Sequence, residues 1–151
     1  MIDSPLDICD AAKLYFTTDC CLSVIQQWYT QIPPEDTFFD IMPMAIIAFP
    51  VEETISVENL DLGDKVTLPP LQIAIYVEIE DGDVGGLIAD RLINRLWWCL
   101  VRRLNGFRYF DKTVDGSRMI SGGISGFPDE TEEIGIKIRW AWVQVECWIH
   151  L

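Results

Sequence analysis

Alternating apolar positions along the chain predict strands that bury one face. The clearest alternation lies in 71–80, where the apolar positions are Leu71, Ile73, Ile75, Val77 and Ile79. A second alternating stretch, 134–151, becomes apolar on both sides toward its end, which is typical of a central strand or of one covered by a partner. A short apolar run at 44–49 predicts a third, buried strand.

Apolar residues spaced three and four apart predict an N-terminal helix over about 4–31. Ser4, Pro5 and Asp7 supply an N-cap, a first-turn proline and a capping-box-like acid in the expected order. The segment 17–19 could interrupt this helix or start a second one, and a pair of prolines ends it.

The same spacing predicts a long helix over about 84–104, with Asp83 as its cap and Gly106 as its stop. Its expected buried residues are Ile88, Leu92, Leu96, Cys99 or Leu100, and Leu104. Trp97 and Trp98 are consecutive, so their side chains point about 100° apart and cannot share one narrow stripe. We therefore expect one of these tryptophans to be partly exposed in an isolated chain.

Together these elements predict a single domain over 1–151 with an α+β fold. We expect a mostly antiparallel sheet packed by the two helices, which form a single layer on one face. The acid-rich middle of the chain is expected to contain a strand near 54–57 and then a turn at Gly63 and Asp64. The glycine-rich segment 111–129 is expected to be a hairpin tip or a long loop.

The composition supports a packed core and argues against nucleic-acid recognition. Apolar residues make up 50% of the 151 residues, and 24 acidic against 11 basic residues give a net charge of −13. Such a surface repels phosphate backbones, which excludes a conventional DNA- or RNA-binding domain. The same charge would let nucleic acid pass without adsorbing, although many proteins carry acidic residues only to stay dispersed.

The chain contains five cysteines and no CxxC spacing; they are Cys9, Cys20, Cys21, Cys99 and Cys147. Adjacent Cys20 and Cys21 suit neither a zinc site nor an easy disulfide pair. We expect most of these thiols to be small buried apolar groups, in a protein made in a reducing cytosol. The chain shows no signal-peptide pattern and no long uncharged apolar span, so we expect neither secretion nor a membrane helix.

No constellation of residues predicts catalysis or metal binding. The acids of 78–83 resemble a calcium loop, but the Glu that such a loop needs near its end is missing, and a strand end plus a helix cap explains them. His150 is the one histidine, and the segment 123–126 lacks the spacing of a nucleophile elbow. We predict no enzyme, no catalytic residue, no cofactor and no metal, and a hydrolase with an unrecognised acidic site stays an open alternative.

The order of elements resembles that of the tail terminator (tail completion) proteins of long-tailed bacteriophages. In that family a short N-terminal helix precedes a strand of the type seen here at 43–48, after Phe38-Phe39-Asp40. An acidic stretch, a strand like 72–80, a helix like 84–104 and a closing strand follow. The resemblance is one of pattern and covers most of the chain, which departs from it in its longer N-terminal helix and its many cysteines and tryptophans.

The resemblance implies a structural virion protein of the tail neck, assembled in the host cytoplasm, that forms a hexameric ring. Such a ring caps the head-proximal end of the tail tube, ends tail polymerisation and offers a surface to the head–tail connector. The implied partners are further copies of the chain, the tail tube protein and the connector protein. DNA would pass through the lumen without specific binding, and no membrane is involved.

Two further functions stay open beside the tail terminator. One is another head–tail connector or head-completion subunit, which would also be a small acidic ring protein. The other is a small-ligand-binding α+β domain, with Trp140, Trp142 and Trp148 lining a pocket.

Three sets of residues are candidates for subunit or partner contacts. The first set is acidic and is expected on an exposed loop near a lumen or ring face, with a plain solvated loop as the alternative. Its members are Glu52, Glu53, Glu58, Asp61 and Asp64. Trp97 and Trp98 are candidates for a subunit interface, because interfaces use aromatic area. The glycine-rich segment 114–126 is the third candidate.

Overall fold

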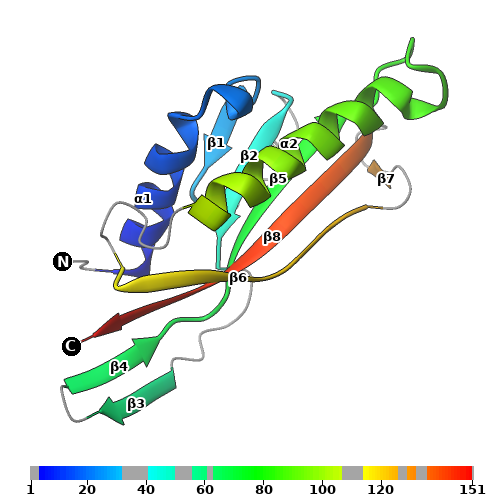
Figure 1. Ribbon diagram of the computed structural model, residues 1–151. Helices are drawn as coiled ribbons and strands as arrows, with labels where there is room; N and C mark the ends of the chain where they lie inside the picture. Colours follow the sequence, from blue (N-terminus) through cyan, green and yellow to red (C-terminus); the bar gives the residue numbers. More distant parts are fainter. Residues whose placement is uncertain are drawn as a thin grey trace.

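The computed structural model describes residues 4–31, 41–49, 56–60, 63–106, 114–125, 129–131 and 136–150. The helices are α1 (Pro5–Thr17) and α2 (Leu87–Gly106), and the short 3₁₀ turns are η1 (Cys20–Leu22) and η3 (Val84–Gly86). The strands are β1 (Gln27–Tyr29), β2 (Met44–Ala48), β3 (Ser56–Leu60), β4 (Gly63–Thr67), β5 (Leu71–Glu78), β6 (Gly116–Ile124), β7 (Asp129–Thr131) and β8 (Ile136–His150). They form one sheet in the order β1-β2-β5-β8-β4-β3, with β6 and β7 also paired to β8 (Figure 1). The predicted α+β fold is confirmed, and among the described pairs only β1 and β2 run parallel.

Strand β8 is the centre of the sheet, and four other strands pair with it. β5 lines one edge, with Leu71 opposite Val145 and Glu78 opposite Ile138. β6 lines the other edge along the same part of β8, and β4 and β7 pair with its two ends. The even-numbered tryptophans, on the other face of β8, pack against each other and against glycines of β6.

β4 and β5 form one long run beside β8 that is broken at Pro69–Pro70. Thr67 pairs with Trp148, and Leu71 pairs with Val145. The chain from β4 to β5 therefore advances four residues where β8 advances three. The extra residue makes a β-bulge, and prolines fit there because they have no N–H to give to a ladder. The bulge marks the boundary between the body of the sheet and the β3–β4 hairpin beyond it.

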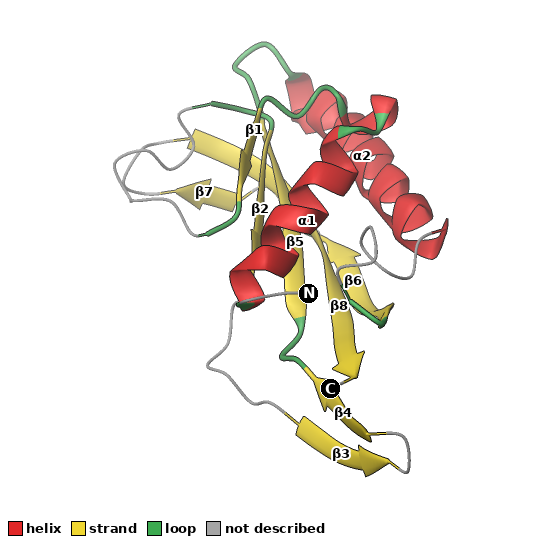
Figure 2. Ribbon diagram, turned by 90° about the vertical axis from the view of Figure 1, so that its left-hand side faces the viewer, coloured by secondary structure: helices red, strands yellow, loops and turns green. Residues whose placement is uncertain are grey.

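Both helices cover the same face of the sheet, as Figures 1 and 2 show. The core between the two layers contains Ile8 and Phe16 of α1, Ile93 and Leu96 of α2, the odd-numbered residues 71–77 of β5, and the odd-numbered residues 141–147 of β8. The predicted single layer of helices is therefore confirmed. Burial of these apolar side chains is the main term that stabilises the fold.

The first turn of α2 differs from the prediction, although its cap does not. The carboxylate of Asp83 accepts hydrogen bonds from the N–H groups of Ile88 and Ala89, both at 2.9 Å. Ile88, predicted to be buried, is 70% exposed, because the helix begins at Leu87 after the η3 turn and places Ala89 inward instead. The buried residues of α2 are Ala89, Ile93, Leu96, Cys99, Leu100 and Leu104.

The predicted helix over 4–31 is wrong in its second half, where the structure has η1 and β1. Asp19 accepts a hydrogen bond from the Cys21 N–H at 2.7 Å and so starts η1 rather than another helical turn. On β1, Trp28 is buried and stacks on Phe16, with ring centroids 6.1 Å apart. A buried strand this short has too few residues to show alternation, and its apolar spacing imitates a helix.

Within the glycine-rich segment 111–129, predicted to be a hairpin tip or a long loop, residues 116–124 form strand β6 instead, and 111–113 and 126–128 lie outside the described residues. Gly123 lies opposite Trp142 of β8, and Gly116 lies opposite Trp148. A methyl group on Gly123 would come 2.7 Å from the Trp142 ring, and one on Gly116 would overlap the Trp148 ring. The two glycines therefore make room for indole rings against the backbone of β6. Glycine adds nothing to apolar alternation, so the sequence pattern hides this strand.

Candidate functional site

The β3–β4 hairpin, which we call the arm, extends away from the helices and the rest of the sheet (Figure 1). Its strands pair from Ser56 opposite Thr67 to Leu60 opposite Gly63. Only Lys65 to Thr67 of the arm pair with β8, and among the described strands β3 pairs with β4 alone. A two-stranded hairpin is marginally stable by itself in water. The arm therefore offers an edge that can gain stability from another strand.

Side chains at the base of the arm fix it to β8. The Nζ atom of Lys65 lies 5.0 Å from the centre of the Trp148 ring, a cation–π contact. Trp148 lies in turn against Gly116, and the Asp115 carboxylate accepts a hydrogen bond from the His150 N–H. The base of the arm is thus held by contacts with β8. For β3, the described strand pairing is with β4.

Two of the five acidic interface candidates lie in the arm rather than in a loop. Glu58 belongs to β3 and Asp64 to β4. The predicted turn at Gly63 and Asp64 is therefore wrong, since both residues are in a strand. A hairpin at the edge of a sheet lacks the alternation by which a half-buried strand is predicted. The candidates outside the described residues are Glu52, Glu53 and Asp61.

The two consecutive tryptophans of α2 have different surroundings, as their divergent directions predict. Trp97 is half-buried, and its Nε1–H donates a hydrogen bond to the carbonyl oxygen of Trp142 at 3.0 Å. Trp98 is 56% exposed. Trp97 therefore fixes the helix to the sheet, and Trp98 is the residue left free for an interface.

The exposed side of α2 carries three arginines and one tryptophan in a line, which we call the α2 stripe. Arg91, Arg95, Trp98 and Arg102 are spaced by four, three and four residues, so they share one face of the helix. All four are exposed, and none of the three arginines forms an ion pair with a described residue. The α2 stripe is a cationic, partly aromatic surface on an acidic protein.

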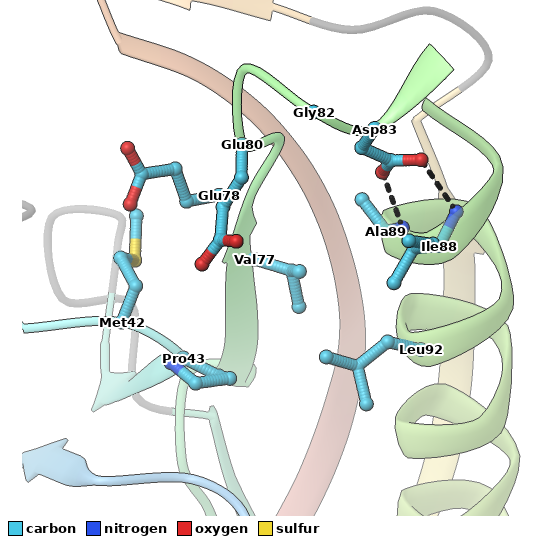
Figure 3. Close-up of a pocket in the computed structure, with 10 residues that line it drawn as sticks. All are labelled: Met42, Pro43, Val77, Glu78, Glu80, Gly82, Asp83, Ile88, Ala89 and Leu92. Atoms are coloured by element: carbon cyan, nitrogen blue, oxygen red, sulfur yellow. Dashed lines mark hydrogen bonds between the residues drawn. The ribbon is translucent and has the colours of Figure 1, made fainter. Parts of the chain in front are cut away.

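A cleft of about 380 Å³ lies where β5 ends and α2 begins (Figure 3). Met42, Val77 and Leu92 give it apolar walls. Glu78 and Glu80 also line it, and neither carboxylate forms an ion pair with a described residue. We call it the acidic cleft. Its combination of apolar walls and free carboxylates suits a ligand that is apolar with a cationic flank.

Exposed apolar side chains are next in sequence to residues that line the acidic cleft. Val84 of η3 and Leu87 of α2 are 87% and 65% exposed, and Ile88, which is 70% exposed, forms part of the lining. Ile41, next to the lining residue Met42, is 45% exposed. Clustered exposed apolar groups of this kind mark sites of contact with other molecules.

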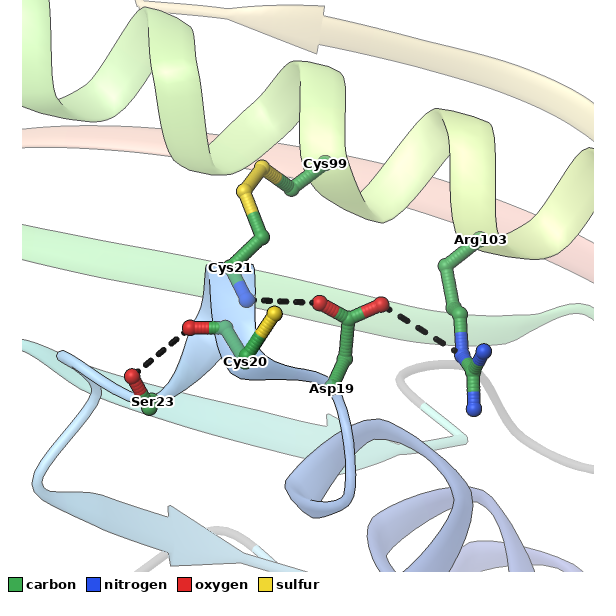
Figure 4. Close-up of a disulfide and its surroundings, with 6 residues drawn as sticks. All are labelled: Asp19, Cys20, Cys21, Ser23, Cys99 and Arg103. Carbon is green, nitrogen blue, oxygen red and sulfur yellow. Dashed lines mark hydrogen bonds and ion pairs between the residues drawn. A yellow bond between two sulfur atoms is a disulfide. The ribbon is translucent and has the colours of Figure 1, made fainter.

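A disulfide between Cys21 and Cys99 joins η1 to α2, with Cα atoms 6.2 Å apart (Figure 4). Adjacent Cys20 and Cys21 do not pair with each other, and Cys20 is a free, exposed thiol. The pairing of Cys21 with the distant Cys99 was not predicted from the sequence. Beside the disulfide, Arg103 pairs with Asp19 at 3.6 Å. These contacts fix the end of α1 and η1 to the helix that carries the α2 stripe.

Buried ionisable side chains in the described part of the chain behave as packing groups. Burial raises the pKa of Cys147 to about 12 and the pKa of Cys9 to about 11. Burial also raises the pKa of Tyr15 to about 12, and its hydroxyl donates a hydrogen bond to the Arg103 carbonyl oxygen at 2.8 Å. Neutral thiols and phenols of this kind are poor nucleophiles, so they stabilise the fold rather than react.

Three further sequence-based expectations concern a metal site, a membrane helix and a pocket lined by tryptophans. Within the described ranges, no group of three or more His, Cys, Asp or Glu side chains is placed to hold a metal ion. No described helix has both the length and the apolar character needed to cross a membrane. Trp140, Trp142 and Trp148, predicted to line a ligand pocket, do not line the acidic cleft. Trp140 and Trp142 instead stack on each other with ring centroids 4.8 Å apart.

The candidate residues predicted from the sequence include neither the arginines of α2 nor the acidic cleft. The spacing of Arg91, Arg95, Trp98 and Arg102 is a signal that could have identified the stripe as a surface for contact. The cleft had no such signal, because it joins the segment before β2 to the end of β5 and the start of α2.

Comparison with known proteins adds no relative to this picture. No protein-family model matches the chain, and no curated protein matches it.

Proposed function

We propose that this chain is a structural subunit that forms a ring on the head-proximal end of a phage tail tube. The ring ends tail polymerisation and provides the surface for the head–tail connector. The observation that carries the proposal is the arm, whose outer strand β3 has one described partner and lies beyond the body of the domain. A strand with an open edge gains main-chain hydrogen bonds when it pairs with a neighbour. Copies joined head to tail in this way close into a ring when their rotation allows it.

Charge and exposed apolar area support the same function. A net charge of −13 suits a ring through which DNA slides, because phosphates are repelled rather than adsorbed. On α1, Leu6 and Leu14 are 56% and 63% exposed, so apolar contact area is also present away from α2. A subunit of the tail neck must contact neighbouring copies as well as the proteins above and below it.

Electron microscopy of the purified protein tests the proposal, both alone and mixed with tail tubes of the same virus. We expect rings of uniform diameter that bind one end of each tube and stop its growth. Free DNA should not be retained in a mobility-shift assay at physiological salt. A protein that neither forms rings nor binds tube ends would contradict the proposed function.

Two adjacent proline substitutions test the role of the arm. Successive residues of a strand direct their N–H groups to opposite edges, so Val57→Pro and Glu58→Pro remove one N–H that faces β4 and one that faces the open edge. The proline at the open edge should abolish rings and leave the melting temperature almost unchanged. The other should lower the melting temperature. Rings that survive both substitutions would show that the arm is not what connects the copies.

The acidic cleft favours a second candidate function, the binding of a small ligand. Its apolar walls and free carboxylates suit a small cation with an apolar tail. A protein that stays monomeric and shows a raised melting temperature with such a compound would support this candidate instead of the ring. A head-completion subunit would form rings but bind the connector rather than the tube end.

A further inference from the structure

We propose that the α2 stripe of one copy docks into the acidic cleft of the next copy. Trp98 is the apolar anchor of this contact, and Arg95 and Arg102 pair with Glu78 and Glu80 of the neighbour. The inference rests on the proposed ring and assigns side chains to one of its subunit contacts.

The two surfaces can be used at the same time by one molecule. From α2, Ile88, Ala89 and Leu92 line the cleft at the start of the helix, and the stripe continues from Arg91 to Arg102 along its exposed side. A head-to-tail contact needs two different patches on each copy, one that receives and one that is received. The stripe and the cleft satisfy this condition, because they share no residue.

Charge is the reason for choosing a second copy as the occupant. The chain has 24 acidic and 11 basic residues, so two copies repel unless cations lie at their contact. Four of those basic residues are on α2, and three of the four form the stripe without an ion pair to a described residue. The free carboxylates of Glu78 and Glu80 are the matching charges in the cleft. Complementary potentials of this kind fix register and speed association.

Trp98 is the side chain best suited to fill the acidic cleft. It is 56% exposed, although a tryptophan gains most when its ring is removed from water. The cleft offers apolar walls from Val77 and Leu92 and the exposed side chain of Ile88. Tryptophan and arginine are the residues that most often carry the binding energy of interfaces. The indole N–H can also donate a hydrogen bond to a cleft carboxylate.

Nucleic acid is the competing occupant of the stripe, because arginine and tryptophan also bind phosphates and bases. It does not fit the cleft, where Glu78 and Glu80 would repel phosphate. The net charge of −13 opposes it as well. The second copy is therefore the occupant that uses both surfaces.

A charge-exchange experiment tests the contact by analytical ultracentrifugation of the full chain. The stripe variant is Arg95→Glu with Arg102→Glu, and the cleft variant is Glu78→Arg with Glu80→Arg. Each variant alone should lose association, because like charges then face each other. An equimolar mixture should recover the mass of the wild-type assembly, because glutamates of one variant then meet arginines of the other.

Two controls separate this contact from general effects of charge and folding. Lys13→Glu with Arg118→Glu makes the same change in net charge away from both the stripe and the cleft and should leave association unchanged. Trp98→Ala keeps every charge and should weaken association at least about 30-fold. Raising salt from about 0.1 M to about 1 M should weaken the wild-type contact, since the screening length falls from roughly 10 Å to 3 Å. Circular dichroism melting confirms that each variant is folded.

The outcomes distinguish this contact from the proposed function. Wild-type rings that persist unchanged in both charge variants would overturn the contact and leave the ring function standing. A wild-type chain that stays monomeric at low salt would also overturn it, and capping of tail tubes then decides the function separately. Retention of DNA that is lost in the stripe variant would assign the stripe to nucleic acid instead.

Discussion

Replacement of Gly123 by alanine tests the packing of β6 against the tryptophans of β8. The added methyl group would lie 2.7 Å from the Trp142 ring, well inside contact distance. The ring has little freedom to move away, because it stacks on Trp140 at 4.8 Å. Gly123 is not among the glycines with positive φ, so alanine suits the backbone and steric overlap is the main cost.

The magnitude follows from two opposing terms. Overpacking of a well-packed position costs about 1–3 kcal/mol. Replacing glycine by alanine in the unfolded chain returns about 0.4–1 kcal/mol, because the unfolded state loses conformational freedom. The net destabilisation of Gly123→Ala is then roughly 1–2 kcal/mol, and in a chain of this length each kcal/mol lowers the melting temperature by about 2–4 °C.

Urea unfolding of a double-mutant cycle measures this effect. In a Trp142→Ala background the ring is gone, so Gly123→Ala should be neutral or stabilising by up to about 1 kcal/mol. Gly82→Ala is the matched control, since no atom lies within 4 Å of its added methyl group, and it should change stability by less than about 0.5 kcal/mol.

Equal destabilisation by Gly123→Ala with and without the Trp142 ring would refute the reasoning. The cost would then come from the backbone of β6 rather than from the indole. A neutral effect in the wild-type background would show that the ring moves aside freely and that glycine is not required there.

Two more predictions concern the cysteines. Cys99→Ser should lower the free energy of unfolding under oxidising conditions by about 2–4 kcal/mol, since the disulfide closes a long loop. The variant should then be as stable as the reduced wild type. Identical urea midpoints of the wild type with and without reductant would contradict this. Iodoacetamide should label exposed Cys20 rapidly in the native protein and leave Cys147 unlabelled, as peptide mass spectrometry can show. Burial raises the pKa of Cys147 from 9.0 to about 12, so its contribution to stability is complete below pH 9 and is lost as the pH rises toward 12.

Elements with a strong apolar period could be predicted from the sequence. β5 and β8 alternate over many residues, and α2 shows both its cap at Asp83 and its end at Gly106. Each of these elements buries one face, so its buried residues recur in the sequence with the period of a strand or a helix. β1 could not be predicted, because it is too short for a period. Of the arm, only a strand near 54–57 was predicted, and it overlaps the start of β3 at Ser56 and Val57.

The candidate interaction surfaces were predictable only in part. The divergent directions of Trp97 and Trp98 predicted that one would be exposed, and Trp98 is. The acidic cleft joins segments far apart in the chain, so no spacing could indicate it. The disulfide joins cysteines 78 positions apart, and a pairing over that distance depends on the fold rather than on any local pattern.

The central position of β8 determines when the domain can fold. β5 pairs with β8 along one edge, yet β8 is synthesised after the other described elements. Until β8 emerges from the ribosome, the nascent chain exposes the unpaired edge and the apolar face of β5. Such a topology, dominated by contacts between distant segments, folds slowly and invites aggregation. Production of the protein in a cell should therefore depend on chaperones that shield β5 until β8 is available to pair with it.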